Sequence, residues 1–232
     1  MNKNIFRAYD IRGNAQTDLD SATLEKIGYV LGAKIKENNS DSVYVGHDSR
    51  LSCEVIKKSL LKGINAAGVK VLYLGLVPTP IVYYATKVGI TSNGIMITGS
   101  HNPKDDNGLK MVINDNAISG IEIRKSVEDI TDVPINDIEI IENVDFEKKY
   151  IEEVKSKVRV DRKLKVILDA GNGAAGILAD RMFNALGHEV ISINKEPDGN
   201  FPNHHPDPSK EKNLTEIKKE INSKNADIGF AF

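Results

Sequence analysis

Short apolar runs alternate along the chain with segments in which apolar residues recur every three or four positions. Such alternation predicts β-strands joined by α-helices. Helices are expected at 24–35, with Ser21 as the predicted cap, at 52–68, where Gly68 ends the segment, and at 78–88. Buried strands are expected at 43–46, 69–74, 93–98 and 109–113.

The pattern changes over residues 121–157, a heavily charged stretch that predicts helical connecting structure. The alternation then restarts, with strands expected at 164–168, 190–193 and 227–232 and helices at 177–186 and 214–221. We therefore predict an α/β fold of two consecutive domains, residues 1–150 and 151–232, each a mixed sheet flanked by helices. The sequence stops within the last expected strand, so we expect the second domain to be truncated.

Composition narrows the class of protein. Of 232 residues, 40% are hydrophobic and 28% charged, which is typical of a globular domain rather than a disordered chain. The formal net charge of −2 and the lack of a long apolar run disfavour nucleic-acid and membrane partners. The single cysteine, Cys53, excludes an internal disulfide and fits a reducing compartment, so we expect a cytoplasmic protein.

A polar loop, TGSHNP at 98–103, follows the expected strand 93–98. In α/β folds, ligand sites gather at the ends of such strands. Ser100 offers a hydroxyl nucleophile, and His101 and Asn102 place polar groups beside it. Ten residues further on is Lys110, after a predicted tight turn at Asn107-Gly108 that would bring it back alongside Ser100.

A hydroxyl, an ammonium and neighbouring donors suit phosphoryl or acyl transfer. Residue types alone leave a second interpretation open, in which the loop is a surface turn and its serine makes local hydrogen bonds.

A second glycine-rich segment, at 169–176, competes for the functional assignment. It contains the spacing G-x-G-x-x-G at Gly171, Gly173 and Gly176, between an expected strand and an expected helix, and Glu196 follows 20 residues later. This arrangement fits the dinucleotide-binding fingerprint and predicts, as an alternative, an NAD(P)-binding oxidoreductase domain. Against it, Asp169 at the strand end would place a carboxylate near the pyrophosphate.

Five blocks of sequence resemble the α-D-phosphohexomutases, the phosphoglucomutase and phosphomannomutase family. The TGSHNP loop resembles that family's phosphoserine loop. The other blocks are FRAYDIRG at 6–13, VGHDSRLS at 45–52 (with His47 where arginine is more usual), NGLK at 107–110 and DGNFPNHHPDP at 198–208. They occur in the family's order, and the resemblance covers domains 1 and 2. The family also has the glycine turn at the start of domain 2, where it is structural.

The resemblance implies an activity. Members convert sugar 1-phosphates to 6-phosphates by way of a phosphoserine, here Ser100, and a bisphosphorylated sugar. Mg²⁺ is implied as cofactor and a sugar 1,6-bisphosphate as activator. The metal would bind one oxygen of the Ser100 phosphate, and its carboxylate ligands would lie beyond residue 232. Domains 3 and 4 would also be missing, so we expect this chain to be inactive alone.

The resemblance also implies roles for single residues. The catalytic set would be Ser100, His101, Lys110 and Arg12, with Lys110 as the general acid/base or as a group that stabilises the phosphoryl. The substrate-binding set would be Tyr9, Arg12, Asn102 and Lys110, and the substrate a hexose phosphate. Glucose, mannose and glucosamine phosphates are not distinguished. Gly99 favours a dual glucose/mannose type, because alanine is common at that place elsewhere in the family.

Overall fold

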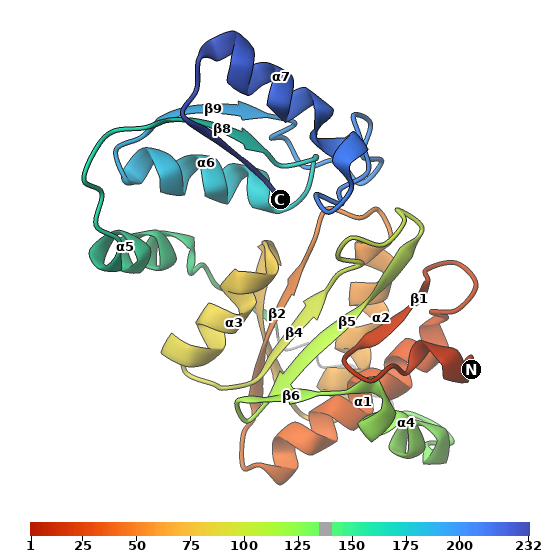
Figure 1. Ribbon diagram of the computed structural model, residues 1–232. Helices are drawn as coiled ribbons and strands as arrows, with labels where there is room; N and C mark the ends of the chain where they lie inside the picture. Colours follow the sequence, from red (N-terminus) through yellow and green to blue (C-terminus); the bar gives the residue numbers. More distant parts are fainter. Residues whose placement is uncertain (135–140) are drawn as a thin grey trace. The chain divides into compact units, whose positions relative to one another are not determined.

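The computed structural model describes residues 1–134 and 141–232, which form two compact units (Figure 1). Unit 1 comprises Met1–Ser100 and Asp105–Asp145, and unit 2 comprises His101–Lys104 and Phe146–Phe232. In the described part of the chain, no helix is both long and apolar enough to cross a membrane.

Unit 1 is built on a mixed sheet in the order β1-β5-β4-β2-β3-β7, with β6 paired to β5. Strands β2, β3, β4 and β7 run parallel, whereas β5 is antiparallel to β1, β4 and β6. The strands are β1 (Ile11–Asn14), β2 (Ser42–His47), β3 (Lys70–Leu76), β4 (Gly94–Ile97), β5 (Asp106–Ile113), β6 (Asn116–Ile118) and β7 (Ile141–Asn143). The helices are η1 (Lys3–Ile5), α1 (Ser21–Glu37), α2 (Cys53–Ala66), α3 (Thr79–Val88) and α4 (Gly120–Asp129).

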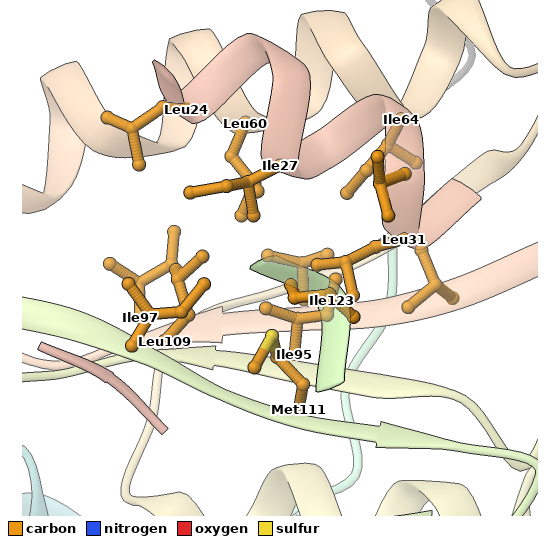
Figure 2. Close-up of a cluster of buried hydrophobic side chains, with 14 of the residues drawn as sticks. Leu24, Ile27, Leu31, Leu60, Ile64, Ile95, Ile97, Leu109, Met111 and Ile123 are labelled. Carbon is orange, nitrogen blue, oxygen red and sulfur yellow. The ribbon is translucent and has the colours of Figure 1, made fainter. Parts of the chain in front are cut away.

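The apolar face of the α1–α2 pair packs on this sheet (Figure 2). Residues three or four positions apart on each helix contact alternate residues of β4 and β5. These spacings follow from the period of about 3.6 residues in a helix and of 2 in a strand. The cluster includes Leu24, Ile27, Leu31, Leu60, Ile64, Ile95, Ile97, Leu109 and Met111. Helix α3 covers the opposite face of β2 and β4, so unit 1 has three layers.

Unit 2 has a smaller sheet in the order β10-β8-β9, and its described strands are all parallel. The strands are β8 (Lys165–Asp169), β9 (Glu189–Ile193) and β10 (Ile228–Ala231). The helices are α5 (Glu147–Lys157), α6 (Ala175–Ala185), η2 (Glu211–Leu214) and α7 (Thr215–Lys224). Helix α6 packs on β8 and β9, and α7 on β8 and β10. The parallel pairing differs from the mixed sheet expected for this domain.

The expected helices and strands are present, and the differences have local causes. Asp20, not Ser21, caps α1, because its carboxylate accepts a hydrogen bond of 2.9 Å from the Thr23 amide. The stretch 121–157 was expected to be helical but contains strand β7 between α4 and α5, and its residues 135–140 lie outside the described part. Asn107-Gly108 belongs to β5 rather than to a turn, with the Asn107 side chain fully buried.

Candidate active site

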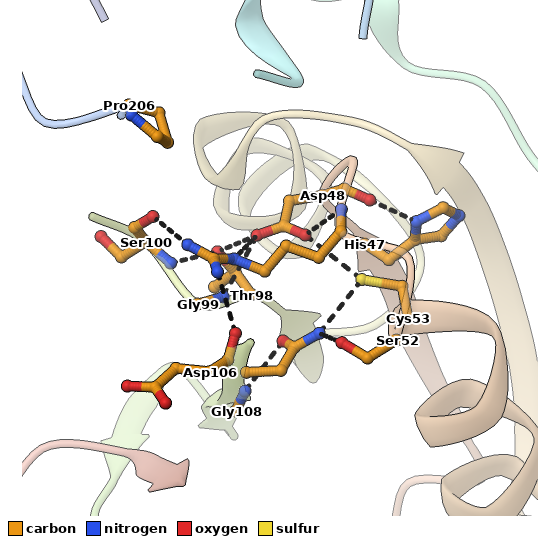
Figure 3. A network of polar contacts seen from close by, with 12 residues as sticks. His47, Asp48, Ser52, Cys53, Thr98, Gly99, Ser100, Asp106, Gly108 and Pro206 are labelled. Atoms are coloured by element: carbon orange, nitrogen blue, oxygen red, sulfur yellow. Dashed lines mark hydrogen bonds and ion pairs between the residues drawn. The ribbon is translucent and has the colours of Figure 1, made fainter. Parts of the chain in front are cut away.

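Ser100 lies in the loop that follows β4 and is exposed (Figure 3). Both of its backbone polar groups are held: its amide donates to Thr98 Oγ1 at 2.8 Å, and its carbonyl accepts from Arg50 Nη2 at 2.8 Å. Its hydroxyl forms no hydrogen bond with the described residues. The loop therefore fixes the backbone of the serine and leaves its nucleophilic oxygen toward solvent.

The backbone of Ser100 has an unusual conformation, with φ at 50°, in the left-handed region. Within the described chain, the other non-glycine residues with positive φ are Asn or Asp, apart from Phe201. For a side chain other than these, the conformation costs about 1–2 kcal/mol. Such strain persists where the surroundings hold it, and it is common where a side chain must be aimed.

Asp48, at the end of β2, organises this loop. Its carboxylate accepts hydrogen bonds from Thr98 Oγ1 at 2.7 Å and from the Gly99 amide at 3.1 Å. It also accepts from the Arg50 amide at 3.0 Å and from the Cys53 thiol at 3.2 Å. One carboxylate thus joins the start of α2 to the serine loop.

Arg50 lies beneath the loop, and its side chain is 0% exposed. Its Nε is 3.3 Å from the Asp48 carboxylate, and its Nη1 donates to the Asp106 carbonyl at 2.9 Å. Burial lowers the pKa of Arg50, which the Asp48 charge opposes and the Arg12 charge reinforces. The side chain remains a cation, since arginine does not lose its proton in proteins.

Gly99 is packed against this guanidinium. A Cβ at position 99 would lie 2.2 Å from Arg50 Cζ and 2.7 Å from the Asp106 carbonyl oxygen. Contact of this kind requires a residue without a side chain. The glycine therefore has a packing cause in this molecule, which weakens its use as a sign of sugar preference.

Arg12, on β1, contacts the loop directly, and Lys110, on β5, is joined to Arg12 through Asp10. Arg12 is 5% exposed and donates from Nη1 to the Gly99 carbonyl and from Nη2 to Asp10 at 2.7 Å. Its Nε has no hydrogen-bond partner in the described residues. Lys110 Nζ lies 3.8 Å from the same Asp10 carboxylate. Two cations thus share one acid beside the serine loop.

The predicted site residues are only partly assembled in unit 1. Ser100, Arg12 and Lys110 belong to it. Lys110 lies on β5 opposite Met96 of β4, and the chain does not reach it through the expected turn, so its place alongside Ser100 stays a prediction. Tyr9 is 89% exposed, so the structure assigns it no packing role.

His101 and Asn102 group with unit 2. There His101 Nδ1 lies 2.7 Å from the Pro206 carbonyl, and His205 Nε2 lies 2.9 Å from the His101 carbonyl. Whether either residue contacts substrate stays a prediction.

Asp48 and Arg50 received no role from the sequence, although they lie within the VGHDSRLS block. The available signal was a pair of opposite charges two residues apart directly after a buried strand. Such pairs are common on surfaces, and only the tertiary contacts separate this one from them.

The groups around Ser100 do not make a Mg²⁺ site by themselves. In the described ranges, no group of three or more His, Cys, Asp or Glu side chains could hold a metal ion. The nearby carboxylates are committed: Asp48 to its donors, and Asp10 to Arg12 and Lys110. The implied metal therefore does not fit the residues present, and no reaction step is derived through it.

The glycine turn of unit 2 uses its own backbone donors. The amides of Gly171, Asn172 and Gly173 bond, respectively, to the Asp169 carboxylate at 3.0 Å, the Asn194 carbonyl at 2.8 Å and the Ala170 carbonyl at 2.7 Å. A dinucleotide site needs such amides for the pyrophosphate. The bonds argue against the oxidoreductase interpretation.

Asp169, which is fully buried, pairs with the partly exposed His204 beside that turn. Asp169 is 0% exposed, and His204 Nε2 lies 3.0 Å from its Oδ2, while His204 Nδ1 lies 3.0 Å from the His205 carbonyl. Both ring nitrogens face acceptors, which favours the doubly protonated imidazolium. Burial lowers the His204 pKa, but the His205 carbonyl and the Asp169 carboxylate outweigh it and raise the pKa above its ordinary value.

Comparison with known proteins agrees with this architecture. The family model for phosphoglucomutase/phosphomannomutase, alpha/beta/alpha domain I, matches residues 3–134, and the family model for domain II matches residues 148–232. A phosphomannomutase/phosphoglucomutase from Pseudomonas syringae is 43% identical over 229 residues, covering 98% of this chain and 49% of that protein. A phosphoglucomutase from Neisseria gonorrhoeae is 36% identical, covering 99% of this chain and 51% of that protein.

Among solved structures, a phosphoglucomutase/phosphomannomutase family protein from Burkholderia thailandensis superposes with a TM-score of 0.92 at 38% identity, covering 100% of this chain and 53% of that one. Two successive α/β/α units with a serine loop at the end of a central strand define a phosphohexomutase-type scaffold. The chain belongs to the phosphoglucomutase/phosphomannomutase family, of which it contains domains I and II. It spans about half the length of the relatives it matches.

Proposed function

We propose that the protein acts in the interconversion of hexose 1-phosphates and 6-phosphates, with Ser100 as the residue that carries the transferred phosphoryl group. The observation that carries this proposal is the exposed Ser100 hydroxyl on a backbone held in the left-handed region. Membership of the family supports the reaction class, and relatives named phosphomannomutase/phosphoglucomutase and phosphoglucomutase support hexose phosphates as substrates.

In the proposed reaction, Ser100 Oγ attacks one phosphorus of a bisphosphorylated sugar. The serine loses its hydroxyl proton, the bond from phosphorus to the sugar oxygen breaks, and that oxygen takes a proton to leave a sugar monophosphate. The isomerisation begins with the reverse step at the other sugar hydroxyl: that oxygen loses its proton and attacks the phosphorus on Ser100, the bond from phosphorus to Ser100 Oγ breaks, Oγ takes a proton, and the bisphosphorylated sugar forms. Lys110 would move these protons or stabilise the phosphoryl oxygens.

Arg12 would bind the phosphoryl group. Its Nη1 and Nη2 donate to the Gly99 carbonyl and to Asp10, and each carries a further N–H that is left for a phosphate oxygen. Tyr9, His101 and Asn102 are further candidates for substrate contact, on the strength of the family motif.

Mg²⁺ and a sugar 1,6-bisphosphate belong to the proposal as cofactor and activator. Because the described residues do not form a Mg²⁺ site, we expect the 232-residue chain alone to turn over hexose phosphates far more slowly than a complete mutase, while a single transfer to Ser100 is detectable on long incubation. Turnover by the purified chain at the rate of a complete mutase would contradict that expectation. Glucose and mannose phosphates are the proposed substrates, to be separated by parallel assays with each.

The phosphoserine can be tested directly. The purified chain is incubated with glucose 1,6-bisphosphate and Mg²⁺, and intact mass and peptide mapping locate any phosphoryl group. One phosphoryl group on Ser100, absent from Ser100→Ala, is expected. Ser156→Ala, at an exposed serine of α5, is a matched control far from the loop in sequence. A phosphoryl group on another residue, or an unmodified Ser100 after prolonged incubation, contradicts the proposal.

A further inference from the structure

We propose that Arg50 is the positioning residue of the serine loop: its buried guanidinium holds Ser100 in the left-handed backbone conformation that directs the hydroxyl outward. This inference rests on the proposed function of Ser100 and adds to it a residue that touches neither sugar nor phosphoryl group.

The Arg50 guanidinium bonds to backbone carbonyls at two places in the chain. Its Nη2 donates to the Ser100 carbonyl at 2.8 Å and its Nη1 to the Asp106 carbonyl at 2.9 Å. The two carbonyls belong to the beginning and the end of the segment 100–106, so one planar guanidinium clamps both ends of the loop. Arginine suits this role because its donors form a rigid fork, whereas a lysine ammonium is a single point of charge.

Asp48 makes the clamp rigid from the other side. Its carboxylate lies 3.3 Å from Arg50 Nε and also accepts hydrogen bonds from Thr98 Oγ1 and from the Gly99 amide (Figure 3). Thr98 Oγ1 in turn accepts a hydrogen bond from the Ser100 amide. The Ser100 amide and carbonyl are therefore both connected to the Asp48–Arg50 pair, and the strained peptide has two anchors rather than one.

Arg50 acts from below the loop and not at its surface. Its side chain is 0% exposed, and the Gly99 Cα is packed against it so closely that a Cβ would overlap Arg50 Cζ at 2.2 Å. A phosphate that approaches the exposed Ser100 hydroxyl cannot reach this guanidinium through Gly99. Arg12 and Lys110 remain the cations available to the ligand, and Arg50 sets the geometry they act on.

The test uses Arg50→Lys, which keeps the charge and removes the fork, with Arg162→Lys as the matched control at an exposed surface pair. Two quantities are measured: hydrogen exchange of the Gly99 and Ser100 amides, and the rate of Ser100 phosphorylation against glucose 1,6-bisphosphate concentration. Because small misplacement of a reacting group is costly, we expect Arg50→Lys to lower the maximal rate about tenfold or more. The half-saturating concentration should stay unchanged, and both amides should exchange faster.

A second variant, Gly99→Ala, displaces the same guanidinium without altering any charge, and it serves if Arg50→Lys does not fold. It should also lower the maximal rate of Ser100 phosphorylation and speed the exchange of both amides. The fold-loss in rate of the double variant should be smaller than the product of the two single fold-losses, because both substitutions act through one contact.

Wild-type rate and exchange in Arg50→Lys would overturn the proposal. A changed half-saturating concentration with unchanged exchange would do so too, since Arg50 would then contact the donor. If wild-type Ser100 accepts no phosphoryl group, the proposed function fails, and amide exchange still decides whether Arg50 holds the loop.

Discussion

The serine loop of unit 1 and the glycine turn of unit 2 are built alike and present different chemistry. Each follows a buried strand with a parallel neighbour, and each is organised by a carboxylate that comes directly after a strand. For the serine loop this is Asp48, after the neighbouring strand β2, and for the glycine turn it is Asp169, at the end of β8, the strand that the turn follows. In the glycine turn the three leading amides are bonded to the protein's own oxygens. In the serine loop the backbone is satisfied while the Ser100 hydroxyl stays exposed.

The comparison shows that glycine spacing alone does not identify a ligand site. The partners of the polar groups decide: a turn whose leading amides bond to the protein's own oxygens is structural, and a loop whose backbone is held so that one side chain points outward is a candidate for catalysis. The two carboxylates also differ in partner, a buried arginine for Asp48 and a histidine for Asp169.

The largest effect is expected for Asp48→Asn. The substitution leaves the buried Arg50 cation without its counter-charge, so it should lower the free energy of unfolding by about 3 kcal/mol. Urea denaturation followed by circular dichroism measures it. Asp161→Asn, which breaks an exposed pair with Arg159, should leave the midpoint nearly unchanged. Equal, small changes in the two variants would mean that Asp48 does not organise unit 1.

Cys53 reports on the same network. Burial raises the pKa of its thiol, and the Asp48 charge raises it further, so almost no thiolate forms near neutral pH. We expect a thiol reagent at pH 8 to react on the order of a hundredfold more slowly with the folded chain than in denaturant. Labelling should accelerate in Asp48→Asn. Equal rates in folded and unfolded wild type would show that the thiol is not enclosed.

Unit 2 should respond to pH through His204. The folded-state pKa of His204 is raised, so its stabilising effect is complete below the unfolded value of about 6.5 and is lost as pH rises through the folded value. Thermal melts from pH 6 to 8 should show this decline in wild type and not in His204→Gln. His188→Gln is the control in the same unit and should keep the wild-type dependence. An identical pH dependence in His204→Gln would assign the effect to another group.

The smallest effect is expected from a nicotinamide dinucleotide. Because the amides of the glycine turn are already bonded, NADH should neither shift the melting temperature of the chain nor change its own fluorescence on mixing. A saturable change in NADH fluorescence that disappears on replacing Gly173 would contradict the structural role of the turn and favour a dinucleotide site.

The sequence determined most of the elements and the place of the serine loop. The hydrophobic periods locate α1, α2 and the central strands, because burial of one face fixes a period of 3.6 or 2 wherever the chain packs on a core. The strand β7 and the parallel sheet of unit 2 were missed, since strand pairing depends on residues far away in the chain.

The sequence could also place Ser100 on a loop after a strand, and motif resemblance could point to Arg12 and Lys110. It could not reveal that Arg50 clamps Ser100, since their contact joins residues 50 positions apart. Nor could it show that the amides of the glycine turn were already in use. Both facts concern the hydrogen-bond partners of buried polar groups. Those partners are set only when the chain has folded and removed the groups from water.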